Sequence, residues 1–297
     1  MKVNLERIVR KINNLTVQRE KNQLIISERR RNGRPSKELR LPQHILLTKE
    51  VIEAFGLFFG EGTRTQEYNR IEFGNTEPQL LRRFINLLKE FNIKNSEIRV
   101  KINIYKEDAE IRSDDELKSY WSKELDIPFQ NFQKITWYQK RGTRKEAAKF
   151  GTVQLRAYHK LLVRIFILTF YQVMQLALSH TQVAQHFLRG IFAAEGFIER
   201  RGKSIHKVGV SCKKDKEIVY KLLRKVGLAP GKYNERMRGF PIRGITNFGI
   251  ILKLKLFELH PKKHEKFMNG IVNHRYFYKI SPLDANPLNP RPVRIEG

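Results

Sequence analysis

The sequence predicts an α+β fold made of two related, pseudo-symmetric halves, each with the element order αββαββα. Three observations predict it. A nine-residue pattern at 54–62 recurs at 188–196, and each copy is followed by the same succession of hydrophobic patterns. The chain has 297 residues, of which 40% are hydrophobic, so it can form a substantial core without disulfides or a structural metal.

The repeated pattern is expected to end a helix in each half. Residues 54–62 read AFGLFFGEG and residues 188–196 read LRGIFAAEG, so both copies share Gly, an aliphatic residue, Phe, a small residue, Glu and Gly at fixed offsets. Thr48 is placed to cap the first helix, and Ser179 with Gln182 has the spacing of a capping box for the second.

Similar elements follow in both halves. The strict alternation of Ile98–Tyr105 indicates a half-buried strand whose outer face carries Arg99, Lys101, Asn103 and Tyr105. The other elements expected in the first half are a hairpin-like segment at 63–74, a helix at 77–91, strands at 133–140 and 152–157, and a helix at 158–178. Those expected in the second half are a hairpin-like segment at 197–211, a helix at 215–226, strands at 231–238 and 241–246, and a helix at 247–259.

These patterns divide the chain into four segments. They are a basic N-terminal extension at 1–45, the first repeat at 46–179, the second repeat at 180–280 and a Pro-rich tail at 281–297. The first repeat includes an acidic insertion near 107–126, which we expect to be helical and to face away from a polyanion that it would repel.

The N-terminal extension gives two further expectations. Its residues Leu5–Ser27 are expected to be helical. The run Arg29–Pro35 ends in Gly-Arg-Pro, which resembles the core of an AT-hook and would place Arg34 in a narrow minor groove; a charged linker is the alternative interpretation.

The net charge predicts a polyanionic partner. The chain has 58 Lys and Arg against 30 Asp and Glu, a formal charge of +28. Each part contributes, with +8 over residues 1–47, +5 over 48–179 and +15 over 180–297. A folded body that is basic throughout favours nucleic acid, because neutralising phosphates releases counter-ions. A ribosome-like structural protein and simple solubility are the alternatives.

Cysteine, histidine and hydropathy patterns exclude several classes. Cys212 is the sole cysteine, which excludes disulfide scaffolds and thiolate-cluster zinc sites within one chain. His260 and His264 have i, i+4 spacing but no further obvious ligands, so zinc is not expected there. The charged N-terminus is neither a signal peptide nor an anchor, and polar residues interrupt Leu161–Leu178, which predicts a buried helix. We expect a protein of the prokaryotic cytoplasm or an organelle matrix, neither secreted nor bound to a membrane.

Glu61 and Glu195 are expected to meet. Packing of the two helices through small residues four positions apart would bring both carboxylates to the same end, about a pseudo-twofold axis. Carboxylates there oppose the helix dipole and repel each other, so a cation is expected between them, and oxygen ligands favour Mg²⁺ over zinc. A single copy would favour ordinary helix packing with a terminal glycine, and the second copy in a matching context argues against that interpretation. The small residues are Gly56 and Gly60 in the first helix, and Gly190 and Ala194 in the second.

The paired segments resemble the LAGLIDADG motif, and the region from about 45 to 280 resembles a single-chain, two-repeat LAGLIDADG homing endonuclease. The resemblance implies motif helices at the interface, a saddle of antiparallel strands in the DNA major groove, and cleavage across the minor groove with short 3′ overhangs. It implies that Glu61 and Glu195, with Gly60 and Ala194, bind Mg²⁺, and that Mn²⁺ or Ca²⁺ can occupy the same sites. Phe59 departs from the motif, which has an earlier Asp at this position.

Lysine near the metals is also typical of that family. Lys213 supplies it in the second half and is the third catalytic candidate, whereas Gly74-Asn75-Thr76 supplies none in the first, so we expect the two strands to be cut at unequal rates. Base contacts are expected from polar strand faces, because Arg and Lys suit guanine edges and Gln and Asn suit adenine. The candidates are Arg64, Gln66, Tyr68, Arg70, Arg99, Lys101, Asn103, Lys140, Arg201, Lys203, His206, Arg236, Arg238 and Arg243.

Three functions remain open at this point. The first is a site-specific endonuclease that acts as a monomer on a long double-stranded DNA target. The second is an RNA maturase that assists intron splicing, which would use the same basic surface without needing both acids. The third is a catalytically inactive DNA-binding regulator, against which the presence of both glutamates argues.

Overall fold

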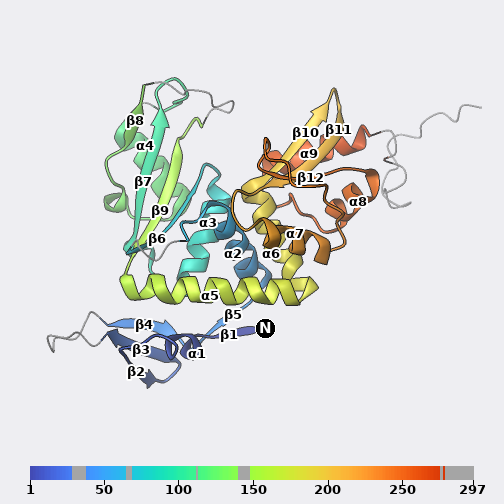
Figure 1. Ribbon diagram of the computed structural model, residues 1–297. Helices are drawn as coiled ribbons and strands as arrows, with labels where there is room; N and C mark the ends of the chain where they lie inside the picture. Colours follow the sequence, from blue (N-terminus) through green and yellow to red (C-terminus); the bar gives the residue numbers. More distant parts are fainter. Residues whose placement is uncertain (29–37, 65–68, 112, 140–147, 275–276, 278–297) are drawn as a thin grey trace, which may run out of the picture.

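The two motif helices lie at the centre of the molecule. The computed structural model describes residues 1–28, 38–64, 69–111, 113–139, 148–274 and 277. Helix α2 (Lys49–Glu61) packs along helix α6 (Thr181–Glu195), with one β-sheet on either side of the pair (Figure 1). The fold is therefore of the α+β class that the repeat predicts.

The first half follows α2 with a four-stranded sheet in the order β6-β9-β7-β8. The β6–β9 and β9–β7 pairs are antiparallel, and β7–β8 is parallel. Strand β7 has the bounds that its alternation predicts, with every second side chain buried. The elements are β6 (Arg70–Asn75), α3 (Pro78–Lys89), β7 (Ile98–Tyr105), α4 (Asp114–Leu125), β8 (Thr136–Tyr138), β9 (Thr152–Tyr158) and α5 (Lys160–Ser179), with short 3-10 helices at Asn95–Glu97 and Phe129–Asn131.

The second half is smaller. Its antiparallel sheet has the order β10-β11-β12. The strand expected at 231–238 is wrong, since that region makes only the isolated bridge of Asn234 with Gly239, and the strand expected at 241–246 begins earlier and is shorter. The helix expected at 247–259 begins earlier, at Ile245, and stops at Lys253, and Lys255 just beyond it has a φ of 56°. The elements are β10 (Gly196–Arg201), β11 (Ser204–Ser211), α7 (Lys216–Lys225), β12 (Gly239–Ile242), α8 (Ile245–Lys253) and α9 (Pro261–Val272).

The N-terminal extension is a small module of its own, and of the helix expected at Leu5–Ser27 only Leu5–Val9 is helical, while most of the rest forms strands. Lys21 adopts a left-handed conformation, with φ of 51°, in a two-residue turn that pairs Glu20 with Gln23 in a hairpin. The module consists of β1 (Lys2–Asn4), α1 (Leu5–Val9), β2 (Leu15–Glu20), β3 (Gln23–Glu28), β4 (Leu39–Pro42) and β5 (His44–Leu46), in the sheets β2-β3-β4 and β1-β5.

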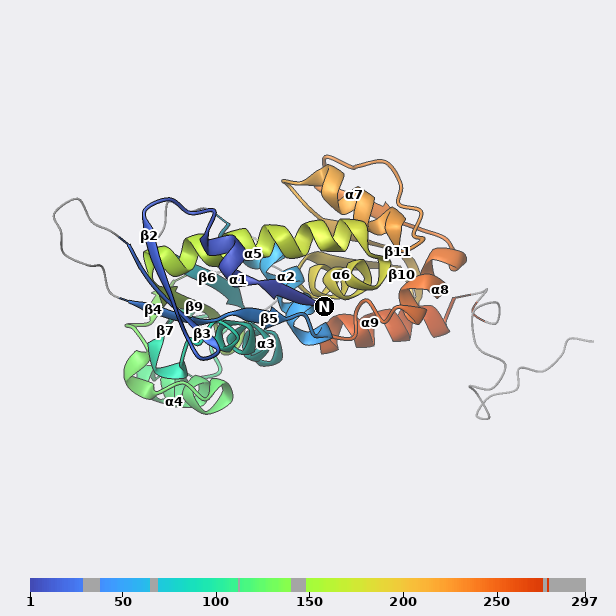
Figure 2. The same ribbon diagram turned by 90° about the horizontal axis from the view of Figure 1, so that it is seen from below.

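Helix α5 joins the three parts. It runs beneath both motif helices, and the N-terminal module lies on its other side (Figures 1 and 2). Its rings Phe166 and Phe170 pack against Phe55 and Phe58 of α2, with centroids 5.0–6.5 Å apart. Phe187 of α6 lies 5.8 Å from Phe59 and 6.5 Å from Phe170, so this aromatic core reaches the second half.

The junction of α5 with α6 differs from expectation. Ser179 is the last residue of α5 and does not cap α6, so the predicted capping box is wrong. His180 alone separates the two helices and makes no capping hydrogen bond through its side chain. Among the described helices, α5 is the one long and apolar enough to cross a membrane, with a hydropathy of 1.8, but 61% of that stretch is buried within the protein.

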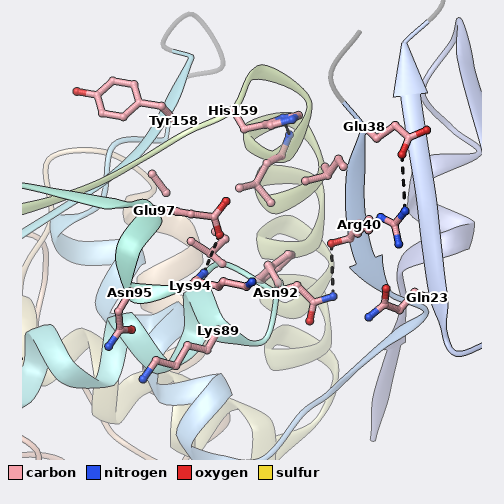
Figure 3. A pocket seen from close by; sticks show the side chains of 15 residues that line it. Gln23, Glu38, Arg40, Lys89, Asn92, Lys94, Asn95, Glu97, Tyr158 and His159 are labelled. Carbon is pink, nitrogen blue, oxygen red and sulfur yellow. Dashed lines mark hydrogen bonds and ion pairs between the residues drawn. The ribbon is translucent and has the colours of Figure 1, made fainter. Parts of the chain in front are cut away.

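A cleft of about 780 Å³ separates the N-terminal module from the first half (Figure 3). Gln23 and Arg40 line it from the module, and Lys94 and His159 line it from the opposite side. The Asn92 side-chain amide donates to the Arg40 carbonyl across the cleft, at 3.4 Å. The module thus contacts the first half directly as well as through α5.

Candidate functional site

The motif helices approach through their small residues, as the spacing predicts. A Cβ on Gly190 would lie 2.1 Å from the Glu53 carbonyl oxygen, and one on Gly56 would lie 2.1 Å from that of Phe187. Near the ends of the helices, a Cβ on Gly60 would lie 2.6 Å from Ala194 Cβ. These distances leave no room for larger side chains, so the four-residue spacing sets how closely the helices pack.

The packing brings Glu61 and Glu195 to the same end. A Cβ on Gly60 would lie 3.0 Å from Glu195 Cγ, so the Glu195 side chain passes beside the end of α2. Glu61 is exposed, but partial desolvation of its carboxylate and, next, the Glu195 charge raise its pKa to about 7. Desolvation also raises the pKa of Glu195. A cation nearby would therefore stabilise the ionised form of both carboxylates.

The closing glycines have a steric role. Gly62 and Gly196 have φ of −86° and −68°, so neither adopts the left-handed conformation of a terminal helix glycine. A Cβ on Gly62 would lie 2.1 Å from the Phe58 ring, and one on Gly196 would lie 2.3 Å from the Phe192 carbonyl oxygen. Glycine lets the chain turn sharply from each motif helix into a strand pairing.

Two lysines lie near the acidic pair. Lys213, which the sequence singled out, is exposed and lowers the pKa of Glu195. Lys263 of α9, which sequence reasoning missed, lowers the pKa of both Glu61 and Glu195. Its Nζ donates to the carbonyl oxygens of Ala193 at 2.7 Å and Ala194 at 2.8 Å. No local pattern marks Lys263, because its partners lie about 70 residues away.

A cavity of about 440 Å³ opens beside Glu195, between the halves. Lys213 lines it, as does Arg64, whose guanidinium pairs with Asp215 of the second half and lies 4.7 Å from the centre of the Phe59 ring. Arg64 therefore connects the halves, and its predicted base contact would require it to leave Asp215.

The donors suit a hard cation. Among the described residues, no group of three or more His, Cys, Asp and Glu gathers in one place. The acidic pair and the carbonyls of Gly60 and Ala194 are oxygen donors of the kind that Mg²⁺ prefers, but the Ala194 carbonyl already accepts from Lys263. His260 caps α9 by accepting from the Lys263 amide, and desolvation with the charge of Lys263 lowers its pKa to about 4.

The outer face of the first sheet carries candidate base-reading residues. Arg99 donates to Asn131 at 3.0 Å, Lys101 is half-buried on the same strand, and Asn103 Oδ1 is buried without a hydrogen-bond partner. Arg70 pairs with Glu72 at 2.8 Å. Sequence reasoning missed Gln154 and Arg156 of β9, which lie opposite Lys101 and Arg99 in register.

The second half carries a more exposed basic group, of which only Arg201 and His206 lie on strands, whereas Lys203, Arg236, Arg238 and Arg243 lie outside β10, β11 and β12. Arg201 and Arg243 both lower the pKa of His206, after desolvation as the larger cause, so these three candidates lie together. Lys203, Arg236 and Arg238 are exposed. The remaining candidates, Arg34, Gln66, Tyr68 and Lys140, lie outside the described residues, as do the Gly-Arg-Pro segment and the Pro-rich tail.

A buried carboxylate, Glu53, lies further along the motif-helix interface and was also missed. It is 2% exposed, and burial raises its pKa. Its carboxylate lies 3.1 Å from Arg83 of α3 and 3.4 Å from Arg189 of α6. These ion pairs tie α2 to both neighbours away from the acidic pair.

Comparison with known proteins identifies a LAGLIDADG-like domain in this chain. Residues 54–120 match the LAGLIDADG-like domain family. The matched region begins within α2 and ends within α4, so it includes the first copy of the motif but not the second. No curated protein matches the chain in sequence.

Solved structures give a distant similarity. Full-length DUF199/WhiA from Thermatoga maritima is 14% identical with a TM-score of 0.39, over 72% of this chain and 60% of that one. The N-terminal LAGLIDADG domain of DUF199/WhiA is 14% identical with a TM-score of 0.40, over 70% of this chain and 81% of that one. The chain thus spans 60% of the length of the full-length protein, and neither similarity says what this chain binds or does.

Proposed function

We propose that this protein is a DNA endonuclease of the LAGLIDADG type, which binds a long duplex as a monomer and cuts both strands with Mg²⁺. The observation that carries the proposal is the meeting of Glu61 and Glu195 at the ends of helices packed through their small residues. Two neighbouring carboxylates at the negative ends of two helices repel each other and oppose the helix dipoles unless a cation offsets their charge.

The residues at this place have separable roles in the proposal. Glu61 and Glu195, with the carbonyls of Gly60 and Ala194, would hold Mg²⁺, and Mn²⁺ or Ca²⁺ would take the same donors. Bound Mg²⁺ supplies a Lewis acid and makes water easier to deprotonate. Lys213 is exposed beside Glu195, where its ammonium would neutralise charge on the reacting phosphate.

The polar strand faces, together with Arg243 just after β12, would read the bases. Arg99, Arg201 and Arg243 suit guanine edges, and Gln154 suits adenine. The net charge of +28 would supply the sequence-independent part of the affinity, which falls as salt rises. The acidic turn at the start of α4, with Asp114, would face away from the duplex.

The test begins with selection of bound duplexes from a random library in Ca²⁺, followed by cleavage of the selected duplex in Mg²⁺. Wild type should cut both strands. Glu61→Gln and Glu195→Gln should bind within a few-fold of wild type yet fail to cut, because the amide keeps the shape and loses the charge. Glu217→Gln, at an exposed carboxylate of α7, is the control and should cut normally. Cleavage at the wild-type rate by either amide variant would sink the mechanism.

One observation favours a second candidate, a protein that binds DNA without cutting it. The ammonium of Lys263 already contacts the Ala194 carbonyl and lies near both carboxylates, so the site has a positive charge of its own. A wild-type protein that binds the selected duplex but leaves it intact in both Mg²⁺ and Mn²⁺ would establish this alternative. Tighter binding to structured RNA than to any duplex would instead indicate a maturase.

A further inference from the structure

The side chain of Lys263, a residue of α9, lies at the end of the second motif helix, α6. Its Nζ donates to the carbonyl oxygens of Ala193 and Ala194, which belong to the last turn of α6. Carbonyls in a last turn have no amide partner within their own helix, and a cation there also complements the helix dipole. The lysine thus provides two hydrogen bonds and a charge at the place where Glu195 adds a negative charge.

The same ammonium acts on both members of the acidic pair. The Lys263 charge lowers the pKa of Glu61, against the larger effect of desolvation. It also lowers the pKa of Glu195, with a larger effect than that of Lys213. It therefore lies among three of the donors proposed for a metal ion, namely the two carboxylates and the Ala194 carbonyl.

The surrounding chain fixes Lys263 in this place. His260 caps α9, and the neighbouring Lys262 pairs with Glu77 of the first half at 2.5 Å. Gln79 of α3 donates to the Leu259 carbonyl at 2.9 Å. The segment 259–263 therefore contacts α3 of the first half and α6 of the second, which anchors the backbone that carries Lys263 beside the end of α6.

We propose that Lys263 is a built-in counter-ion of the acidic pair, which stabilises the metal-free protein and competes with a divalent cation for the donors at the end of α6. The inference rests on the proposed function for the identity of that cation. Wild type then binds divalent metal more weakly than its donors allow, and metal binding requires the ammonium to withdraw from the Ala194 carbonyl.

The first experiment measures Ca²⁺ binding to the full chain by calorimetry, without DNA. Lys263→Met should bind Ca²⁺ about tenfold more tightly than wild type, because it loses one competing charge contact. Lys266→Met is the matched control, since Lys266 lies on the same helix α9 at an exposed position. Its Ca²⁺ affinity should equal that of wild type, and a Lys263→Met protein with unchanged or weaker affinity would overturn the proposal.

A second variant covers the case in which Lys263→Met does not fold. Lys263→Gln keeps hydrogen-bond donors for the two carbonyls without the charge, and it should fold and bind Ca²⁺ more tightly than wild type. Folding of either variant only when Ca²⁺ is added would also support the proposal. Failure of both to fold even in Ca²⁺ would overturn it, because the lysine would then be a structural cap.

A thermodynamic cycle separates this proposal from the nuclease proposal. Without metal, Lys263→Met should lower the free energy of unfolding more in the wild-type background than in Glu195→Gln, where the charge to be balanced is gone. This coupling is expected even if the protein neither binds Ca²⁺ nor cuts DNA. Equal losses in the two backgrounds would refute the counter-ion while leaving the cleavage tests untouched.

Discussion

At the scale of single residues, Glu61 and Glu195 have different surroundings. Lys213 lies beside Glu195, whereas the corresponding turn of the first half ends in Thr76, and the Asn75 side chain accepts from the Thr76 and Glu77 amides to begin α3. The ends of the two motif helices therefore have different charges beside them, and under the proposed function the two DNA strands should experience different chemistry.

The Lys213→Met variant should slow cleavage of one strand far more than the other, so that nicked DNA accumulates. Loss of one charge contact to the transition state would cost on the order of 10²-fold, by analogy with removal of an oxyanion donor. A strand-labelled time course at saturating protein measures it. Equal slowing of both strands, with weaker binding and a lower salt slope, would mean that Lys213 is only a phosphate contact.

His260 should make stability depend on pH. Its folded pKa of about 4 is below the unfolded value of 6.5, because of burial and of Lys263. Between these pH values the folded state thus binds fewer protons than the unfolded state. The free energy of unfolding is therefore highest above pH 6.5 and falls as the pH drops towards 4. Relative to His260→Asn, which can still cap a helix, wild type should lose roughly 3 kcal/mol at most over this range.

Denaturant unfolding at several pH values measures the effect of His260. His264→Asn, at an exposed position of the same helix, is the control and should follow the wild-type curve. A constant difference between wild type and His260→Asn from pH 7 to pH 4 would contradict the assignment.

At the scale of elements, sequence patterns succeed where a local signal decides the structure. The alternation of β7 and the periodicity of α3 predict those elements because their buried faces follow directly from residue spacing. The N-terminal hairpin was missed because a left-handed Lys21, without glycine, makes its turn. The acidic pair was predictable from the repeat, but Lys263 and Arg189 were not, since contacts over long sequence separations leave no local pattern.

The helix interface gives a prediction about packing. Gly190→Ala should lower the free energy of unfolding by about 1–3 kcal/mol or more, because its Cβ would lie 2.1 Å from the Glu53 carbonyl, which belongs to backbone and cannot rotate away. Gly74→Ala is the control, since the nearest atom to its Cβ would be 3.5 Å away. Comparable stability of the two variants in urea would show that the interface can relax.

At the scale of the whole molecule, the halves form one body. Arg64 pairs with Asp215 and Lys262 pairs with Glu77, each across the boundary between halves. The aromatic rings of α5 pack on α2, whose partner α6 belongs to the second half. A single chain therefore presents both sheets in one fixed arrangement and needs no second copy to complete the acidic pair.

We expect one protein chain per duplex and a target site that is only partly symmetric, because each half carries one copy of the motif but the halves differ at most candidate base-reading positions. Sedimentation of the complex with a selected duplex measures the stoichiometry. Two chains per duplex would remove the argument that the repeats act as the two halves of one site.

The junction of α5 and α6 through His180 alone limits which changes in a DNA target the protein could tolerate. Helix α5, of 20 residues, passes into α6 without a linker, so the distance between the sheets cannot adjust. One base pair inserted at the centre of a duplex would move one half-site by about 3.4 Å and rotate it by roughly 35°. Each base substitution in a target would remove only the contacts to that base, so binding would weaken step by step. A central insertion or deletion would instead displace a whole half-site and abolish binding in a single step.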